Sequence, residues 1–205
     1  MPTNSVNEND SVYPTGLKVH LREDSPPTIN TLGNLDLLNL RKLAIFCSAE
    51  CPGELIMQAQ EIIQMTGATK VAVMSGFHSP GERACLTTLL QGTRPIIICP
   101  ARSLIKMRIR TEYKEPLDEG RLLFLSFFRS HRHRSDTNMA LNRNRFVAAI
   151  ADTILVVHAA HGGKTDGFCR EIIEWGKPLF TVASDLNQNL MALGAKPLNV
   201  NELEP

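Results

Sequence analysis

Aromatic residues are scarce in this sequence, and long hydrophobic runs are missing. Of the 205 residues, 43% are apolar but only 5% are aromatic, as eight Phe, two Tyr and one Trp. Tyr and Trp are therefore too few for an extended platform on which nucleic-acid bases stack. No apolar run approaches the roughly 18 residues that a membrane-spanning helix needs, and the polar first forty residues do not resemble a signal peptide. We expect a cytoplasmic protein with no membrane segment.

The cysteines do not form a recognisable metal or disulfide pattern. Their number is odd and their spacing irregular, at Cys47, Cys51, Cys85, Cys99 and Cys169. Cys47 and Cys51 are four residues apart rather than three, and no pair of histidines at ligand spacing accompanies them. We therefore expect buried, reduced thiols, with neither a zinc site nor a disulfide framework.

Charge is balanced over the whole chain but not along it. Lys and Arg total 22 against 21 Asp and Glu, for a net charge of +1. Residues 101–145 contain eleven Lys and Arg against five Asp and Glu, a local excess of +6, whereas residues 1–42 have a net charge of −1. A neutral protein with one basic stretch has the charge distribution of a protein that binds an anion at one place.

Short apolar runs alternate with helical patterns from residue 43 onward, and they predict the fold. Six strands are expected at 43–47, 71–74, 95–99, 122–125, 153–157 and 179–182. Helices are expected at 54–65, 81–91, 102–112, 138–151, 167–176 and 187–193. Because the strands are apolar throughout, both faces of the sheet should be covered. This pattern predicts a single α/β domain, with a doubly wound, mostly parallel Rossmann-like sheet and helices on both faces.

The first 42 residues do not share this pattern. Residues 1–12 contain little that can pack, so we expect a disordered N-terminus. Residues 13–42 contain several prolines, which exclude a long helix, and we expect an extended lead-in that packs on the core. The Rossmann-like core is then expected to occupy residues 43–205.

Candidate binding loops follow the strands, because ligands of an open parallel sheet bind beyond the carboxyl ends of its strands. The turn at 162–165 reads Gly-Gly-Lys-Thr and precedes a helix, where backbone amides favour a phosphate. It is not a complete P-loop, since His158 stands where the upstream glycine belongs. A phosphate-binding turn is the favoured interpretation, and a purely structural glycine turn is the alternative.

Arginines gather before and at the start of the helix expected at 138–151. Cations are unfavourable near a helix N-terminus unless an anion compensates them. Arg143 and Arg145, which follow Arg129, Arg132 and Arg134, therefore favour an external polyanion over a merely solvated helix start. No metal is expected at the nearby histidines, no serine has an acid and histidine placed as a catalytic triad, and no cofactor or catalytic residue is expected.

Several short motifs occur together along this chain. The lead-in contains the patterns Y-P-x-x-L, P-P and G-N-x-x-L-L, at Tyr13, Pro14, Leu17, Pro26, Pro27, Gly33, Asn34, Leu37 and Leu38. Ser75-Gly76 opens the loop after the second expected strand, and Arg143-Asn144-Arg145 forms an R-N-R motif. Together these motifs resemble the DNA-processing protein A family (DprA, also called Smf), which belongs to a superfamily with the LOG proteins, and the resemblance covers about residues 13–198.

This resemblance implies binding of single-stranded DNA in a basic pocket, homodimer formation, and delivery of a RecA-type recombinase during DNA recombination and natural transformation. The residues expected to contact DNA or phosphate are Ser48, Ser75, Gly76, Arg129, Arg132, Arg134, Arg143, Asn144, Arg145, Gly162, Gly163, Lys164 and Thr165. The chain departs from the family at Ala49, where an arginine is usual, and gains a cation at Lys164. A nucleotide-binding sensor or a LOG-like nucleoside-phosphate hydrolase is the alternative function.

Overall fold

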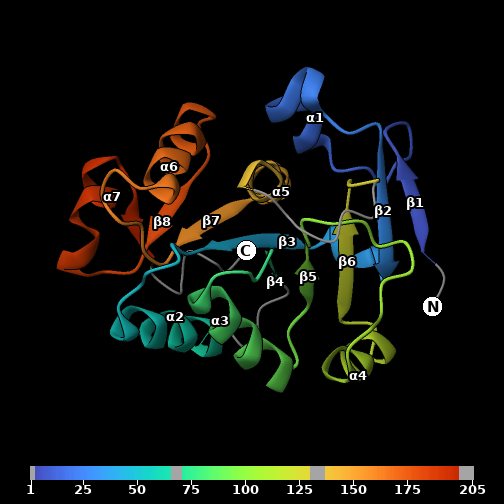
Figure 1. The fold of residues 1–205 in the computed structure, drawn as a ribbon, viewed down its shortest axis with the longest axis horizontal. Coiled ribbons are helices and arrows are strands. Elements are labelled where there is room, and N and C mark those ends of the chain that lie inside the picture. Colours follow the sequence, from blue (N-terminus) through green and yellow to red (C-terminus); the bar gives the residue numbers. More distant parts are fainter. Residues whose placement is uncertain (1–2, 66–70, 130–136, 199–205) are drawn as a thin grey trace.

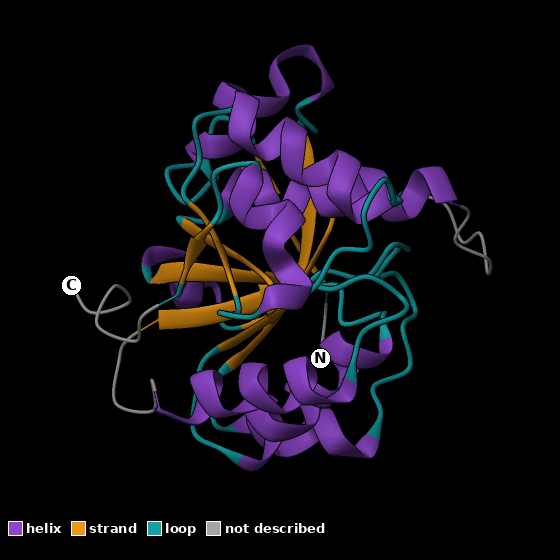
Figure 2. Ribbon diagram, turned by 90° about the vertical axis from the view of Figure 1, so that its left-hand side faces the viewer, coloured by secondary structure: helices purple, strands orange, loops and turns teal. Residues whose placement is uncertain are grey.

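The computed structural model describes residues 3–65, 71–129 and 137–198, which form one sheet between two layers of helices (Figures 1 and 2). Within these residues, the strands are β1 (Asn4–Asn7), β2 (Thr28–Gly33), β3 (Arg41–Phe46), β4 (Val71–Ser75), β5 (Ile96–Ile98), β6 (Leu122–Ser126), β7 (Thr153–Val156), β8 (Leu179–Thr181) and β9 (Lys196–Pro197). The α-helices are α1 (Thr15–Leu21), α2 (Gly53–Met65), α3 (Pro80–Gln91), α4 (Lys114–Asp118), α5 (Thr137–Ile150), α6 (Lys164–Glu174) and α7 (Gln188–Ala192). Short 3-10 turns make up the remaining helical segments.

The sheet is parallel except at one edge. The strand order in the described residues is β1-β2-β6-β5-β4-β3-β7-β8-β9, and β2 pairs antiparallel with both β1 and β6. From β3 the chain proceeds to β4, β5 and β6 on one side, and it returns as β7 on the other side of β3. The topological switch point therefore lies between β3 and β7, where the loops after these strands diverge.

Both faces of the sheet are buried, as the continuous apolar strands predict. Helices α1, α5 and α6 cover one face, and α2, α3 and α4 cover the other (Figure 1). Phe46 and Phe146 lie in the first core, and Leu55 and Leu89 lie in the second. The predicted fold class and all six predicted strands are confirmed, with bounds that differ by a residue or two.

The N-terminal segment is more ordered than the sequence indicated. Residues 4–7 form β1 rather than a disordered tail, because the edge of β2 offers them backbone hydrogen bonds and Val6 is buried. The lead-in is not simply extended either, since it contains α1 and β2. The Tyr13 hydroxyl donates a hydrogen bond of 2.6 Å to the Pro26 carbonyl and so joins the residues before α1 to those before β2.

The prediction of a helix at 102–112 is also wrong. Residues 102–110 form an irregular loop, followed by a 3-10 turn at Thr111–Tyr113 and the short α4. The Ser103 hydroxyl accepts the amide of Ile105, which competes with a helical hydrogen bond, and Lys106 adopts a φ of 57°. The basic residues of this stretch are therefore on a loop at the carboxyl edge of the sheet.

Candidate nucleic-acid interface

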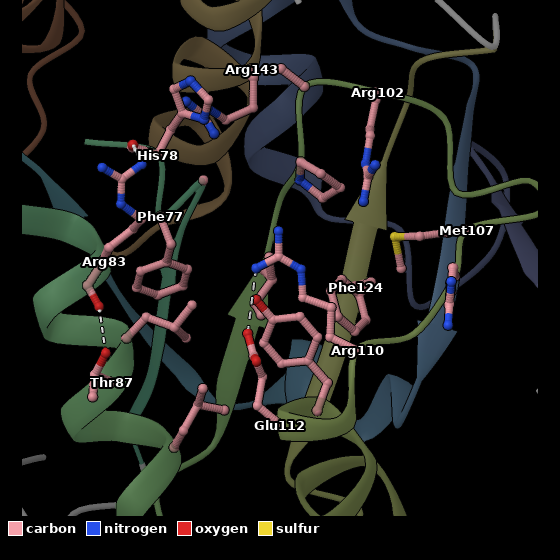
Figure 3. A pocket seen from close by; sticks show the side chains of 18 of the residues that line it. Phe77, His78, Arg83, Thr87, Arg102, Met107, Arg110, Glu112, Phe124 and Arg143 are labelled. Carbon is pink, nitrogen blue, oxygen red and sulfur yellow. Dashed lines mark hydrogen bonds and ion pairs between the residues drawn. The ribbon is translucent and has the colours of Figure 1, made fainter. Parts of the chain in front are cut away.

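A cleft of about 700 Å³ lies over the carboxyl ends of β4, β5 and β6. One wall is the exposed face of α3, and the other is the loop that follows β5, as Figure 3 shows. Apolar and aromatic side chains form part of the inner surface, at Phe77, Leu86, Leu90, Ile98, Met107, Tyr113 and Phe124. Basic side chains line the same cleft, at His78, Arg83, Arg102, Arg108, Arg110 and Arg143. The cleft therefore combines an apolar interior with positive charge.

Two arginines face this cleft from opposite walls. Arg83 is exposed on the first turn of α3, and Arg110 is exposed on the opposing loop (Figure 3). Glu112 is the sole carboxylate among the described residues that line the cleft, and its Oε1 lies 3.5 Å from Nη1 of Arg110. Both side chains of this pair are at least half exposed, so the pair contributes little to stability. An incoming phosphate can compete with the Glu112 carboxylate for Arg110.

Arg143 reaches the cleft from α5, and it is 5% exposed. Its Nη1 donates to the Cys99 carbonyl at 3.2 Å, and its Nε donates to the Asn144 side chain at 2.7 Å. Burial lowers the pKa of Arg143, and the negative charge of Glu82 opposes that shift. The guanidinium also lies over Gly76, where a Cβ would be 1.1 Å from Nη1. Arg143 therefore fastens α5 to the ends of β4 and β5.

Glu82 shapes the cleft wall although it does not line it. This buried carboxylate accepts the amide of His78 at 2.7 Å and the amide of Cys47 at 3.2 Å. Ser79 and Glu82 also form a reciprocal capping box at the N-terminus of α3. Glu82 thus ties the loop after β3 to the loop after β4.

The switch point is a separate region beside the cleft. The Ser48 amide donates to the His158 carbonyl at 3.0 Å, which places the loops after β3 and β7 side by side. The His158 ring makes a 3.0 Å hydrogen bond to the Asn187 side chain. Neither Ser48 nor the turn at 162–165 lines the cleft.

The glycine-rich turn leads into α6 as expected, with Gly162 at a φ of 70° and Gly163 as the N-cap. Burial alone would raise the pKa of Asp166, but hydrogen bonds from Asn189, Arg170 and the Gly162 amide lower it. A buried internal carboxylate therefore already occupies part of the helix N-terminus. Lys164 is exposed there and Thr165 is partly exposed, and their phosphate-binding role stays a prediction.

The remaining sequence-predicted residues are dispersed. Arg145 does not face the cleft, because its Nε donates to both carboxylate oxygens of Glu171 on α6, at 2.7 and 3.0 Å. Ser75 is buried, and its hydroxyl accepts the amide of Phe77. Arg129 is exposed after β6. Arg132 and Arg134 lie outside the described residues.

A family model described as DNA recombination-mediator protein A matches residues 4–200. The chain belongs to this family. Two solved structures of DNA processing protein A share the fold, each with a TM-score of 0.78. The protein from Streptococcus pneumoniae is 22% identical, and the match covers 99% of this chain and 73% of that one. The protein from Helicobacter pylori is 18% identical, with coverage of 98% and 94%. No curated protein sequence matches the chain.

Membership of the DNA recombination-mediator protein A family agrees with the motifs, and the structure explains several of them physically. Asn34 donates to the Gly120 carbonyl at 2.8 Å and caps the following 3-10 turn. Gly33 is needed because a Cβ would lie 2.2 Å from the Leu122 carbonyl oxygen. In the R-N-R motif, Arg143 and Arg145 both make internal bonds. Much of this motif therefore holds the fold together.

Four arginines of the cleft, Arg83, Arg102, Arg108 and Arg110, were not among the site residues expected from the sequence. Arg102, Arg108 and Arg110 belong to the basic segment at 101–145, so the charge count contained a signal for them. The incorrect helix prediction concealed that they lie on one loop. Arg83 had no comparable signal, because a single arginine on a helix is usually a solvated one.

Among the described residues, no helix has the length and apolar character to span a bilayer.

Proposed function

We propose that this chain binds single-stranded DNA in the cleft and acts, without catalysis, in DNA recombination during natural transformation. Family membership supports the proposal, as does the structural relative from Helicobacter pylori, which is described by its mode of binding single-stranded DNA. The observation that carries it is the set of exposed arginines, Arg83, Arg102, Arg108 and Arg110, around an apolar interior.

This arrangement suits a single strand for a physical reason. Arginine guanidinium groups pair with phosphate oxygens, and apolar or aromatic surfaces accept the faces of unpaired bases. In the cleft, Tyr113 is the partly exposed ring, and it packs edge-to-face on the buried Phe124 with ring centroids 5.4 Å apart, beneath the basic rim. The bases of a duplex are paired and stacked, so they cannot reach this interior without melting. A single strand can occupy both surfaces at once.

The accessory roles that the family resemblance implies are part of the same proposal. They are a homodimer, a cytoplasmic location and delivery of strands to a RecA-type recombinase. The absence of catalysis is also proposed. In its support, the glycine-rich turn at 162–165 is not a complete P-loop, since His158 stands where the upstream glycine belongs.

A second candidate is a nucleotide-binding sensor or a LOG-like nucleoside-phosphate hydrolase. The observation that favours it is the cleft volume of about 700 Å³, which lies within the range of small-molecule sites. Arginines that line this cleft, such as Arg83 and Arg110, would supply the phosphate contacts. A nucleotide would then bind as tightly as a strand, and binding would not grow with strand length.

A competition experiment separates the two functions. Fluorescence anisotropy of labelled dT oligomers of increasing length is measured with AMP, ATP and unlabelled duplex as competitors. The strand proposal predicts affinity that rises with length, weak competition by nucleotides and duplex, and a salt slope of about −0.7 per phosphate contact. The strand proposal would be refuted if AMP displaced the labelled oligomer at a concentration at which longer unlabelled strands did not. Release of adenine from AMP would favour the hydrolase.

A further inference from the structure

The cleft contains an ion pair that does not connect separate parts of the fold. Arg110 and Glu112 are two residues apart, at the start of the same 3-10 turn, so their contact joins no two elements. By contrast, the pair of Arg145 and Glu171 joins α5 to α6. The side chains of Arg110 and Glu112 are 72% and 50% exposed. This pair is therefore available to a ligand in the cleft.

The Glu112 carboxylate keeps its capacity to accept hydrogen bonds. Its Oε1 lies 3.5 Å from Nη1 of Arg110, beyond the roughly 2.7–3.2 Å of an ordinary N–H···O hydrogen bond. A carboxylate has two oxygens with about four acceptor positions between them. Figure 3 shows Glu112 extending toward Arg110 within the cleft. A ligand therefore meets two acceptor oxygens with a guanidinium donor beside them.

For the phosphates of a strand, this carboxylate is unfavourable. Among the described residues that line the cleft, Glu112 is the one carboxylate, and it faces several arginines. Negative charge at this place weakens the attraction of the cleft for a phosphate backbone. Glu112 can strengthen binding only by accepting hydrogen bonds from the strand, and the edges of the bases carry suitable donors.

Tyr113 offers a place for a base beside this carboxylate. It follows Glu112 directly in the chain, and its partly exposed ring lines the cleft. The ring packs edge-to-face on the buried Phe124, with centroids 5.4 Å apart, and this contact supports its orientation. Bases of every identity stack on exposed aromatic rings. A base on Tyr113 therefore lies beside Glu112, which can distinguish one base from another.

The four bases differ in the hydrogens that they offer to a carboxylate. Guanine presents two neighbouring donors, N1–H and the 2-amino group, with the O6 acceptor next to them. Cytosine and adenine each present one amino group beside a ring nitrogen that is itself an acceptor. Thymine presents one N–H between two carbonyl oxygens, which repel a carboxylate. Only guanine can therefore donate to both oxygens of Glu112 at once.

We propose that Glu112 makes the cleft selective for guanine, by accepting hydrogen bonds from N1–H and the 2-amino group while Arg110 donates to O6. This inference rests on the proposed function, because it requires a single strand in the cleft. A bidentate contact to a base discriminates by at least about fivefold in affinity. A strand with guanine should therefore bind at least about fivefold more tightly than a strand of thymine alone.

Fluorescence anisotropy with single-base substitutions tests the selectivity. The reference probe is the shortest dT oligomer that the full chain binds, and four further probes carry one central dG, dA, dC or deoxyinosine. The dG probe should bind most tightly. Deoxyinosine keeps N1–H and O6 but lacks the 2-amino group, so its affinity should lie between those of the dG and dT probes.

Two matched variants assign the selectivity to one side chain. Glu112→Gln replaces one acceptor oxygen with a donor, so it should bind the dG and dT probes equally. It should also bind the dT probe more tightly than the wild type does, because the cleft loses a negative charge. Glu115→Gln is the control. It removes an exposed carboxylate on α4 that does not line the cleft, and it should keep the preference for guanine.

The outcomes separate this inference from the proposed function. Selectivity for guanine is overturned if the wild type binds the dG probe no more tightly than the dT, dA or dC probes. It is equally overturned if Glu112→Gln keeps the preference. In both cases strands still bind, so the strand proposal stands. If no probe binds at any length, the strand proposal is refuted and the selectivity with it.

Discussion

A methyl group on Gly76 has no room in this fold, and alanine at that position is expected to destabilise the protein strongly. The added Cβ would lie 1.1 Å from Nη1 of Arg143 and 1.8 Å from its central guanidinium carbon. Arg143 is nearly fully buried, so the side chain cannot simply turn into solvent. Either the guanidinium leaves the Cys99 carbonyl, or the loop after β4 moves away from it.

The cost of each response can be worked out separately. Losing the hydrogen bond of a charged donor to the Cys99 carbonyl costs about 1.5–3 kcal/mol. Displacing a packed segment to fit one extra carbon costs about 1–3 kcal/mol. The response with the lower cost should dominate, and part of the other response should accompany it. The free energy of unfolding is therefore expected to fall by about 2–4 kcal/mol in Gly76→Ala.

Urea denaturation followed by circular dichroism measures this change, and Gly167→Ala is the matched control. Gly167 is the fourth residue of α6, and a Cβ there would meet nothing within 4 Å. That variant should gain about 0.5–1 kcal/mol from helix propensity. In an Arg143→Ala background, Gly76→Ala should cost at least about 1 kcal/mol less than in the wild type. Equal costs in both backgrounds would refute the steric argument.

Three further predictions concern stability, each measured as the free energy of unfolding. Tyr13→Phe should lose about 1 kcal/mol, because the hydroxyl bonded to the Pro26 carbonyl is removed; a neutral result would mean that this hydrogen bond does not hold the N-terminal segment. Arg145→Ala should lose no more than about 1 kcal/mol, since its pair with Glu171 is partly exposed, and a loss of several kcal/mol would contradict that. The pKa of Asp166 is lowered in the folded state, so this carboxylate stabilises the fold above its unfolded pKa of about 3.9, and the stabilisation is lost as pH falls below it. In Asp166→Asn, the free energy of unfolding should fall less as the pH is lowered than it does in the wild type. An unchanged pH profile would contradict the role given to Asp166.

The parallel part of the fold could be predicted because burial leaves a direct signal. Strands such as 71–75 and 122–126 are apolar at nearly every position, and a strand covered on both faces has no other reason to be so. The two antiparallel strands β1 and β2 carry no such signal. They are rich in polar residues, with only a few buried apolar side chains such as Val6 and Ile29, and they pair with an existing sheet edge.

The site was less predictable than the fold, because side-chain partners are invisible in a sequence. Arg143 and Arg145 were expected to be available cations at a helix start, but α5 begins at Thr137, and one arginine is buried over Gly76 while the other is bound to Glu171. Their partners come from the loops after β4 and β5 and from α6, far away in the chain. Conversely, Arg110 had no recognisable motif, and its place in the cleft depends on an irregular loop that local propensity did not predict.

The charge of the cleft is the central claim, and the salt dependence of strand binding tests it most directly. The double variant Arg83→Ala/Arg110→Ala removes two exposed cations from opposite walls. Lys196→Ala removes one exposed cation from β9, at the far edge of the sheet, as the control. Affinity for a labelled dT oligomer is measured by anisotropy at several salt concentrations, after urea denaturation shows that both variants are as stable as the wild type. The double variant should bind at least about tenfold more weakly, with a slope of log K against log salt that is shallower by about 1.4, and the control should match the wild type. An unchanged slope in the double variant would contradict the account and place the DNA elsewhere on the molecule.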